Sequence, residues 1–304
     1  MSIFLDFDGT ITTEDTVTHL ANFALRFQSE RHDSSEDGPS SEPPTQERVR
    51  GAEDLSSRWD AVVHAYVSDH KSHVSSYAPR APDRQCVEDE VAFLRSQKHV
   101  ETRSLGRINA CALFRGIGPA AFRAAGAALV RDGTVRLRPG FAAFTRAALA
   151  RGRRVCVVSV NWSAAFIEGA CGAFAEGEVA VFANEVREAD GAVLGPGALG
   201  GNGDGEGRNL TNSCDKRDAV REVMRAHGAE DGPFFYFGDS TTDMECLLEA
   251  TRGVVIADNE TSSLIKALRR IGKRVPHVRD ADASEELVWA SNFEEVMQST
   301  LDLP

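Results

Sequence analysis

Short apolar runs alternate with longer segments of helical periodicity along much of this chain. The first run opens residues 3–8, and later apolar runs fill residues 154–158, 179–182, 234–237 and 253–256. Helical patterns follow most of these runs, at residues 141–148, 162–174, 215–227, 244–250 and 261–271. Strands that alternate with helices build parallel sheets. The pattern therefore predicts an α/β fold with a doubly wound parallel sheet.

Residues 17–133 interrupt this alternation with helical patterns alone. Apolar residues recur at helical spacing near residues 59–67, again at 87–94, and through most of 104–130. Residues 29–58 differ, because only three of thirty are apolar and Ser, Glu, Pro and Asp dominate. Such a composition buries too little apolar surface to fold, so we expect a disordered insertion there. The sequence does not identify a protein partner for this acidic segment.

Composition restricts the function in a few respects. The net charge of −12 disfavours nucleic acid as a partner, because nucleic-acid binding needs a basic surface. No apolar run approaches the length of about 18 residues that spans a membrane, so no membrane association is expected. The first apolar stretch has no basic flank and is broken by Asp6, unlike a secretory signal. The six cysteines form no C-x-x-C pair, so we expect reduced thiols and a cytoplasmic location.

Two carboxylates stand at the carboxyl end of the first predicted strand. Asp6 and Asp8 are two residues apart, which places both on one face of an extended chain. Ligands of open parallel sheets bind just beyond the carboxyl ends of the strands. Two buried negative charges are costly without a partner, and carboxylate oxygens suit magnesium. Asp6 and Asp8 are therefore candidates for a metal-dependent site.

Three later segments bring further polar residues to strand ends or helix starts. Ser159 closes the apolar run at 154–158, and Lys216 lies in the first turn of a predicted helix. Asp239 and Asp243 follow the strand at 234–237. Taken singly, each residue has a plain structural interpretation, such as a turn, a helix cap or a solvated lysine. Their occurrence together favours one catalytic site.

The four segments resemble the motifs of the haloacid dehalogenase superfamily of phosphatases, in its phosphoserine-phosphatase-like branch. Residues 6–10 read D-x-D-G-T, Ser159 and Lys216 match the second and third motifs, and residues 238–243 read G-D-x-x-x-D. The resemblance covers residues 1–16 and about 135–260. It implies a Rossmann-like core at residues 1–16 and 134–304. It also implies that residues 17–133 are a helical cap, which closes over the site and selects substrates.

The resemblance also assigns roles to the matching residues. Asp6 would be the nucleophile that forms an aspartyl-phosphate, and Asp8 the general acid and base. Ser159 and Lys216 would bind the phosphoryl group. Magnesium (Mg2+) would be held by Asp6, Asp239 and the main-chain carbonyl of Asp8, while Asp243 would hold a metal-bound water or orient Lys216. The implied activity is magnesium-dependent hydrolysis of a small phosphorylated metabolite.

Other functions remain open at this point. A phosphoryl-transfer mutase would use the same motifs, and a catalytically silent interaction protein would use the acidic segment for docking. A dehalogenase lacks the second carboxylate of the first motif, so Asp8 argues against it. Residues 191–207 are rich in glycine but lack a G-K-[ST] ending, which favours a surface loop over a phosphate-binding loop.

Several residues bear on substrate choice. The phosphoserine-phosphatase-like branch carries a glutamate for the substrate amine where this chain has Asp15, and Arg107 does not align cleanly with the arginine that binds the carboxylate. Both departures argue against phosphoserine itself. Trp162 either forms a wall of the pocket or packs beneath it. His70 and His73 share a helix face and form either a metal pair or an exposed or interfacial pair. Residues 182–195 resemble a hairpin that follows the second motif in that branch.

Overall fold

The computed structural model describes residues 1–34, 46–172, 179–197 and 208–299. Its centre is a six-stranded sheet with the order β3-β2-β1-β6-β7-β8, in which every neighbouring pair is parallel. The strands are β1 (Ser2–Leu5), β2 (Arg154–Val158), β3 (Val179–Phe182), β6 (Phe234–Gly238), β7 (Arg252–Ile256) and β8 (Leu287–Ala290). The predicted α/β class with a doubly wound sheet is confirmed. Strand β8 is an addition that the sequence patterns did not predict.

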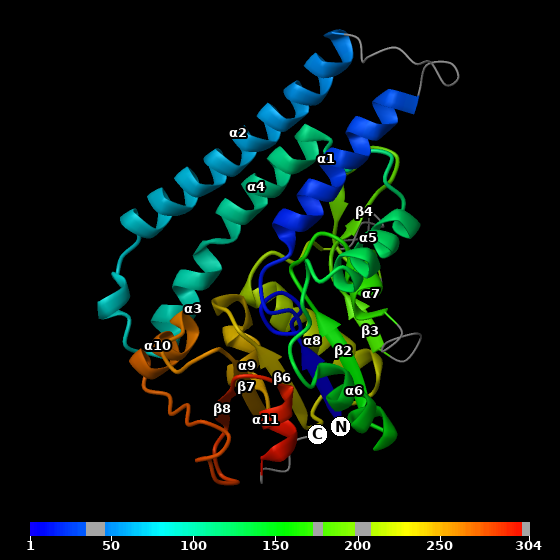
Figure 1. Cartoon of the computed structure of the whole chain (residues 1–304). Coiled ribbons are helices and arrows are strands. Elements are labelled where there is room, and N and C mark those ends of the chain that lie inside the picture. The colour runs from blue at the N-terminus through cyan, green and yellow to red at the C-terminus, as the bar shows by residue number, and fades with distance from the viewer. Residues whose placement is uncertain (35–45, 173–178, 198–207, 300–304) are drawn as a thin grey trace.

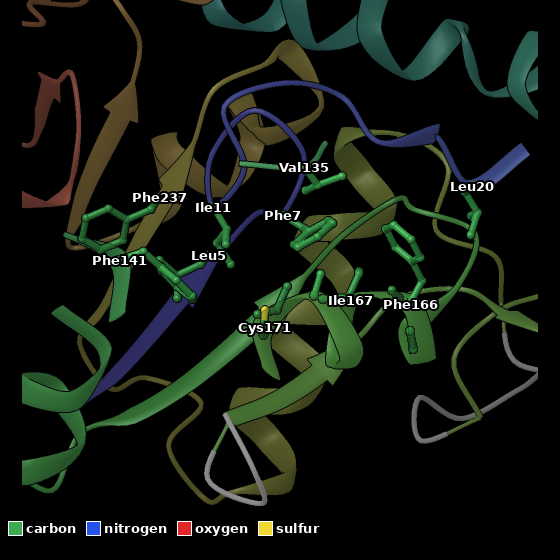
Figure 2. Packing of buried hydrophobic residues seen from close by; sticks show 14 of the residues in the cluster. Leu5, Phe7, Ile11, Leu20, Val135, Phe141, Phe166, Ile167, Cys171 and Phe237 are labelled. Atoms are coloured by element: carbon green, nitrogen blue, oxygen red, sulfur yellow. The ribbon is translucent and has the colours of Figure 1, made fainter. Parts of the chain in front are cut away.

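Side chains of β1 alternate between two apolar layers. Ile3 and Leu5 belong to the layer with helices α6 (Phe141–Ala150), α7 (Ala164–Cys171) and α11 (Phe293–Gln298). Phe4 belongs to the opposite layer with α8 (Ser213–Ala226), α9 (Met244–Glu249) and α10 (Ser263–Arg270). Figure 2 shows part of the first layer. Because both faces are covered, β1 is buried throughout, and its neighbours β2 and β6 are buried except at their first residues. The carboxyl ends of the three strands are thereby fixed in position.

In the described residues between β1 and the core helix α6, every element is helical. Helices α1 (Val17–Ser34), α2 (Gln46–Ser76) and α4 (Lys98–Cys111) extend away from the sheet side by side (Figure 1). A short 3-10 turn, η1 (Ala81–Asp83), and helix α3 (Val87–Ser96) join α2 to α4. Helix α5 (Pro119–Arg131) then returns to the core. No helix in the described residues is long and apolar enough to cross a membrane.

The acidic stretch at residues 29–58 was expected to be disordered, but the described parts of it are helical. Helix α1 continues to Ser34 and α2 begins at Gln46, so both ends of the stretch are helical, while residues 35–45 lie outside the described residues. The physical reason is contact with α4. Arg58 donates hydrogen bonds to the carbonyl oxygens of Ala110 and Cys111 at 3.1 and 3.0 Å, and Leu55 packs against the apolar layer. A few anchoring residues suffice because Gln, Glu and Arg are good helix formers.

The return helix α5 packs closely on α7 through two glycines. A Cβ atom at Gly126 would lie 2.2 Å from the carbonyl oxygen of Phe166, and one at Gly169 would lie 2.0 Å from that of Arg123. The two helix backbones can therefore approach only because both positions lack a side chain. This contact places α5, which falls within the predicted cap range of 17–133, against a helix of the core. The division of the chain into core and cap stays a prediction.

Substitution of Gly169 by alanine is expected to destabilise the protein by about 1–3 kcal/mol, because the new methyl group overlaps a backbone carbonyl. Chemical denaturation would measure the loss. The control is Gly106→Ala on α4, where a Cβ meets no atom within 4 Å and alanine favours the helix over glycine. Equal stability of the two variants would contradict this account of the helix crossing.

Ion pairs tie the corner between α3 and α4 to the core. Arg95 forms an ion pair with Glu245 of α9, with Nη2 2.5 Å from Oε2. Lys98 pairs with Asp215 of α8. Both carboxylates are buried, while the arginine and lysine are partly exposed. The corner is thereby attached beside Lys216, which follows Asp215 on α8.

A small hairpin stands beside the sheet. Strands β4 (Glu185–Val186) and β5 (Val193–Leu194) pair in antiparallel fashion, which confirms the hairpin expected at residues 182–195. Of the glycine-rich segment at 191–207, the described part therefore includes a strand, and residues 198–207 lie outside the described residues.

Candidate active site

Asp6 is the first residue beyond β1 and is buried. Its main-chain N–H donates to the carbonyl oxygen of Phe237 at 2.9 Å, which continues the contact between β1 and β6. Its Oδ1 accepts a hydrogen bond from the N–H of Phe7 at 2.7 Å and lies 2.8 Å from Nζ of Lys216. The carboxylate is thus fixed at the carboxyl edge of the sheet, where the sequence predicted it.

Lys216 is fully buried between two carboxylates. Its Nζ donates to Oδ1 of Asp243 at 2.7 Å in addition to its contact with Asp6. Burial lowers the pKa of Lys216, but the charges of Asp243 and Asp6 outweigh it, so the pKa is raised and the ammonium stays charged. Asp243 is itself held by Tyr236, whose hydroxyl donates to Oδ1 at 2.8 Å. Of the two roles expected for Asp243, these contacts support the orientation of Lys216.

Asp239 lies against the turn that follows Asp8. The Thr10 hydroxyl donates to Oδ1 of Asp239 at 3.1 Å. Gly9 has a φ of +75°, and a Cβ there would lie 2.2 Å from Oδ2 of Asp239, so only glycine fits this turn. Arg138 donates a hydrogen bond to the carbonyl oxygen of Gly9 at 2.7 Å and thereby stabilises the turn. Sequence reasoning missed Arg138, which lies far from the motifs along the chain.

Three carboxylates gather around one ammonium group at this edge. Asp6, Asp239 and Asp243 each offer an oxygen atom, and these atoms lie within 4.8 Å of one another. Burial, followed by the charge of Asp243, raises the pKa of Asp239 to about 7, and the same two causes raise that of Asp6 well above its usual value. Lys216 offsets only part of this repulsion. A cluster of hard oxygen donors with excess negative charge fits a divalent metal ion.

Magnesium is expected to raise the melting temperature of the wild-type protein, because a ligand that binds only the folded state stabilises it. Asp239→Asn removes one donor and part of the repulsion, so this variant should be more stable without metal and respond less to it. Thermal unfolding with magnesium and with a chelator would measure both effects. An equal magnesium shift in the two proteins would contradict the assignment of Asp239 as a ligand.

Asp8 has a separate environment. Its Oδ1 accepts hydrogen bonds from the N–H and hydroxyl of Thr16 at 2.8 and 2.6 Å, and its Oδ2 accepts one from Asn161 at 2.8 Å. Burial and then the charge of Asp15 raise the pKa of Asp8, although these hydrogen bonds lower it in part. A carboxyl group with a raised pKa that is held by fixed donors suits proton transfer.

Ser159 and Asn161 shape the loop after β2. The Ser159 side chain is fully buried, and its Oγ accepts a hydrogen bond from the N–H of Asn161 at 3.1 Å. Asn184 in turn donates to the carbonyl oxygens of Val160 and Asn161 at 3.1 Å each. Sequence reasoning identified Ser159 but missed the role of Asn161. Its place two residues after Ser159, at the same strand end, was the available signal.

A cavity of about 310 Å³ lies between the helices α1, α2 and α4 and the loops that hold Asp8. Trp162 lines this cavity and packs edge-on against Trp59 of α2, with ring centroids 6.0 Å apart. Of the two arrangements considered for Trp162, the structure therefore places it in the wall. Asp15 also lines the cavity.

Three other candidate residues, Arg107, His70 and His73, lie away from the site. Arg107 pairs with Asp69 at 2.7 Å and does not line the cavity. His73 shares a hydrogen bond of 2.8 Å with Ser96, and neither it nor His70 belongs to a potential metal cluster among the described residues. The alternative of a histidine metal pair is not supported, and His73 is an interfacial residue that stacks on Phe93.

Comparison with protein families matches residues 95–248, just over half of the chain, to the haloacid dehalogenase-like hydrolases. The chain belongs to this family. The match includes Ser159, Lys216, Asp239 and Asp243, whereas Asp6 and Asp8 precede it. Membership of the haloacid dehalogenase-like hydrolases confirms the predicted resemblance and the expectation of an enzyme.

Comparison with solved structures gives matches of low sequence identity. Cytosolic 5'-nucleotidase IIIB bound to cytidine aligns with a TM-score of 0.51 and 15% identity over 89% of this chain and 77% of its own. A substrate-bound phosphoserine phosphatase aligns with a TM-score of 0.48 and 11% identity over 97% and 96% of the two chains. A protein of unknown function from Bordetella pertussis Tohama I aligns with a TM-score of 0.47 and 17% identity over 88% of this chain and 94% of its own. No curated protein sequence gives a significant match.

Proposed function

We propose that this haloacid dehalogenase-like hydrolase is a magnesium-dependent phosphatase that acts on a small phosphomonoester. The observation that carries the proposal is the pair Asp6 and Asp8. Asp6 contacts the buried ammonium group of Lys216 at 2.8 Å, while Asp8 is held by Thr16 and Asn161 with a raised pKa. These contacts support a role for Asp6 as the nucleophile that attacks phosphorus and for Asp8 as the group that carries the proton.

In the first half-reaction, a carboxylate oxygen of Asp6 attacks phosphorus in line with the ester oxygen. The bond between phosphorus and the alcohol oxygen breaks, and Asp8 gives its proton to the departing alcohol. The products are a phosphoryl group bound to Asp6 and a free alcohol. Lys216 supplies positive charge to the phosphoryl oxygens, and Ser159 lies at the neighbouring strand end as a hydrogen-bond donor.

In the second half-reaction, the roles reverse. Asp8, now ionised, takes a proton from water, and the water oxygen attacks phosphorus. The acyl phosphate bond breaks, inorganic phosphate leaves, and Asp6 returns to its carboxylate form. Asp8 ends the cycle protonated, which its raised pKa favours.

Asp6, Asp239 and the main-chain carbonyl of Asp8 would hold magnesium, with Asp243 beside them orienting Lys216. The bound cation would neutralise charge on the phosphoryl oxygens and lower the repulsion among the carboxylates. Residues 17–133 would act as the substrate-selecting cap over a core of residues 1–16 and 134–304. The cavity beneath α1, α2 and α4 is consistent with this division.

The direct test is phosphate release from a panel of small phosphomonoesters, measured with magnesium and with a chelator. We expect release that requires magnesium. Nuclear magnetic resonance of the phosphorus products would separate hydrolysis from a mutase reaction, because a mutase yields an isomeric phosphate ester in place of inorganic phosphate. A folded, magnesium-binding protein that releases no phosphate from any ester would contradict the proposal.

A further inference from the structure

Arg138 is a buried arginine beside the turn that follows Asp8, and only 7% of its surface is exposed. Its Nη2 donates a hydrogen bond to the carbonyl oxygen of Gly9 at 2.7 Å. Its main-chain N–H donates another to the carbonyl oxygen of Ile11 at 2.8 Å. Both acceptors belong to the loop that links β1 to α1, so Arg138 holds this loop at two points.

The carbonyl group of Gly9 lies between two of the proposed metal ligands. The main-chain carbonyl of Asp8 is one peptide earlier along the chain. Gly9 approaches Asp239 so closely that a Cβ would lie 2.2 Å from its Oδ2, and the Thr10 hydroxyl donates to its Oδ1 at 3.1 Å. The carbonyl that Arg138 binds therefore joins the two residues that contact Asp239. Its position sets the Asp8 carbonyl relative to the Asp239 carboxylate.

The same guanidinium group is held by the loops after β7 and β8. Its Nη1 donates to Oδ1 of Asp258 at 2.8 Å and to the carbonyl oxygen of Ser291 at 3.1 Å. The Asp258 side chain is 80% exposed, and exposed ion pairs contribute little. Ser291 is better fixed, because its N–H donates to Oε2 of Glu295 on α11 at 2.8 Å. Arg138 therefore ties the loop after β1 to β8 and α11.

This arrangement is costly for the fold. The Nε of Arg138 is buried and has no hydrogen-bond partner among the described residues, and the carboxylate of Asp258 is largely exposed. A buried charge with an unpaired donor destabilises a protein. Departures of this kind from optimal packing are expected where function requires a residue. The contact with the Gly9 turn indicates that the function concerns the carboxylate cluster.

We propose that Arg138 is a positioning residue for the magnesium site, and that it sets the Asp8 carbonyl against Asp239 by holding the carbonyl oxygen of Gly9. This inference rests on the proposed magnesium-dependent function and adds a residue that lies outside the four motifs. It also gives a role to the elements that follow residue 248, where the family match ends, because they supply the Ser291 carbonyl that fixes the guanidinium group.

Charge and placement predict opposite effects of Arg138 on metal affinity. Removal of a positive charge near the carboxylate cluster would by itself favour the binding of a cation. Loss of the hydrogen bond that places the Gly9 peptide would weaken binding, since residues that orient metal ligands typically contribute about 10- to 100-fold to affinity. A merely structural contribution would change the stability of the protein and leave its magnesium affinity unchanged.

The test is Arg138→Gln, with the magnesium dissociation constant measured by isothermal titration calorimetry at a temperature where circular dichroism shows a folded protein. We expect the dissociation constant to rise by about tenfold or more. At saturating magnesium, kcat for p-nitrophenyl phosphate should return to within a few-fold of the wild-type value, because Asp6 and Lys216 keep their contact.

Arg84→Gln is the matched control. Arg84 is also buried, with 5% of its surface exposed, and it donates hydrogen bonds to Glu90 and to the carbonyl oxygen of Pro79, neither of which belongs to the site. Its replacement removes the same charge and should lower stability, but the magnesium dissociation constant should stay at the wild-type value. An equal rise in both variants would overturn the inference.

The remaining outcomes separate this inference from the proposed function. A wild-type protein that binds magnesium as tightly as Arg138→Gln does, or less tightly, overturns the role of Arg138 alone. A wild-type protein that binds no magnesium overturns both proposals. If Arg138→Gln does not fold, Arg138→Lys takes its place, because lysine keeps the charge but cannot offer separate nitrogen atoms to Gly9 and Ser291. We expect its magnesium affinity to fall several-fold, and wild-type affinity in this folded variant overturns the inference.

Discussion

Asp6→Asn is expected to abolish phosphate release while the protein remains folded. An amide oxygen is too weak a nucleophile to attack phosphorus, so activity should fall by several orders of magnitude. The fold should survive because Lys216 keeps its 2.7 Å contact with Asp243, and because asparagine matches aspartate in size. Phosphate release and thermal unfolding would be measured side by side.

A trapping experiment makes this prediction specific to the nucleophile. The wild-type protein would be quenched with acid during turnover of an ester that carries radioactive phosphorus. Radioactivity should remain on the wild-type protein, and Asp6→Asn should carry none. Label on the variant, or activity near that of the wild type, would remove Asp6 as the nucleophile.

Asp8→Asn is expected to slow both half-reactions, with a loss of about 10²- to 10⁴-fold for an alkyl phosphate. The amide can neither give a proton to the alcohol nor take one from water. In the wild-type protein, the rate should fall as rising pH passes the raised pKa of Asp8, because the protonated acid is lost. That alkaline decline should be absent in the variant.

An ester with a good leaving group separates the two roles of Asp8. Nitrophenolate leaves without a proton, so the variant should still form the phosphoryl-enzyme from p-nitrophenyl phosphate but hydrolyse it slowly. Rapid mixing should then show a burst of nitrophenolate close to one equivalent per enzyme. Steady turnover at the wild-type rate, without a burst, would refute the assignment of Asp8 as general acid and base.

The position of the principal candidate residues could be predicted because parallel strands all end at the same edge of the sheet. Asp6, Ser159 and Asp239 follow three adjacent parallel strands, and Lys216 opens a helix that packs on the same edge. Thr16, Asn161 and Arg138 could not be assigned roles in this way. Each acts through one contact that depends on the folded path of a loop, as with Arg138 and the carbonyl oxygen of Gly9.

The acidic stretch at residues 29–58 shows that composition alone does not predict whether a segment is helical. Few apolar residues made residues 29–58 resemble a disordered insertion, yet Leu55 and Arg58, about ten residues into α2, hold this helix against the apolar layer and α4. Composition describes how much apolar surface a segment can bury by itself. It does not describe the surface that a neighbouring helix offers, and here that neighbour decides the outcome.

The ion pairs at the corner between α3 and α4 restrict how the proposed cap could move. Arg95 and Lys98 are attached to α9 and α8, and α8 also carries the lysine that contacts Asp6. We therefore expect this corner to stay fixed, so that widening of the cavity would require the long helices α1 and α2 to move relative to it. Substrate exchange would then proceed from the side of α1 and α2, while the phosphoryl end of the site keeps its geometry throughout the cycle.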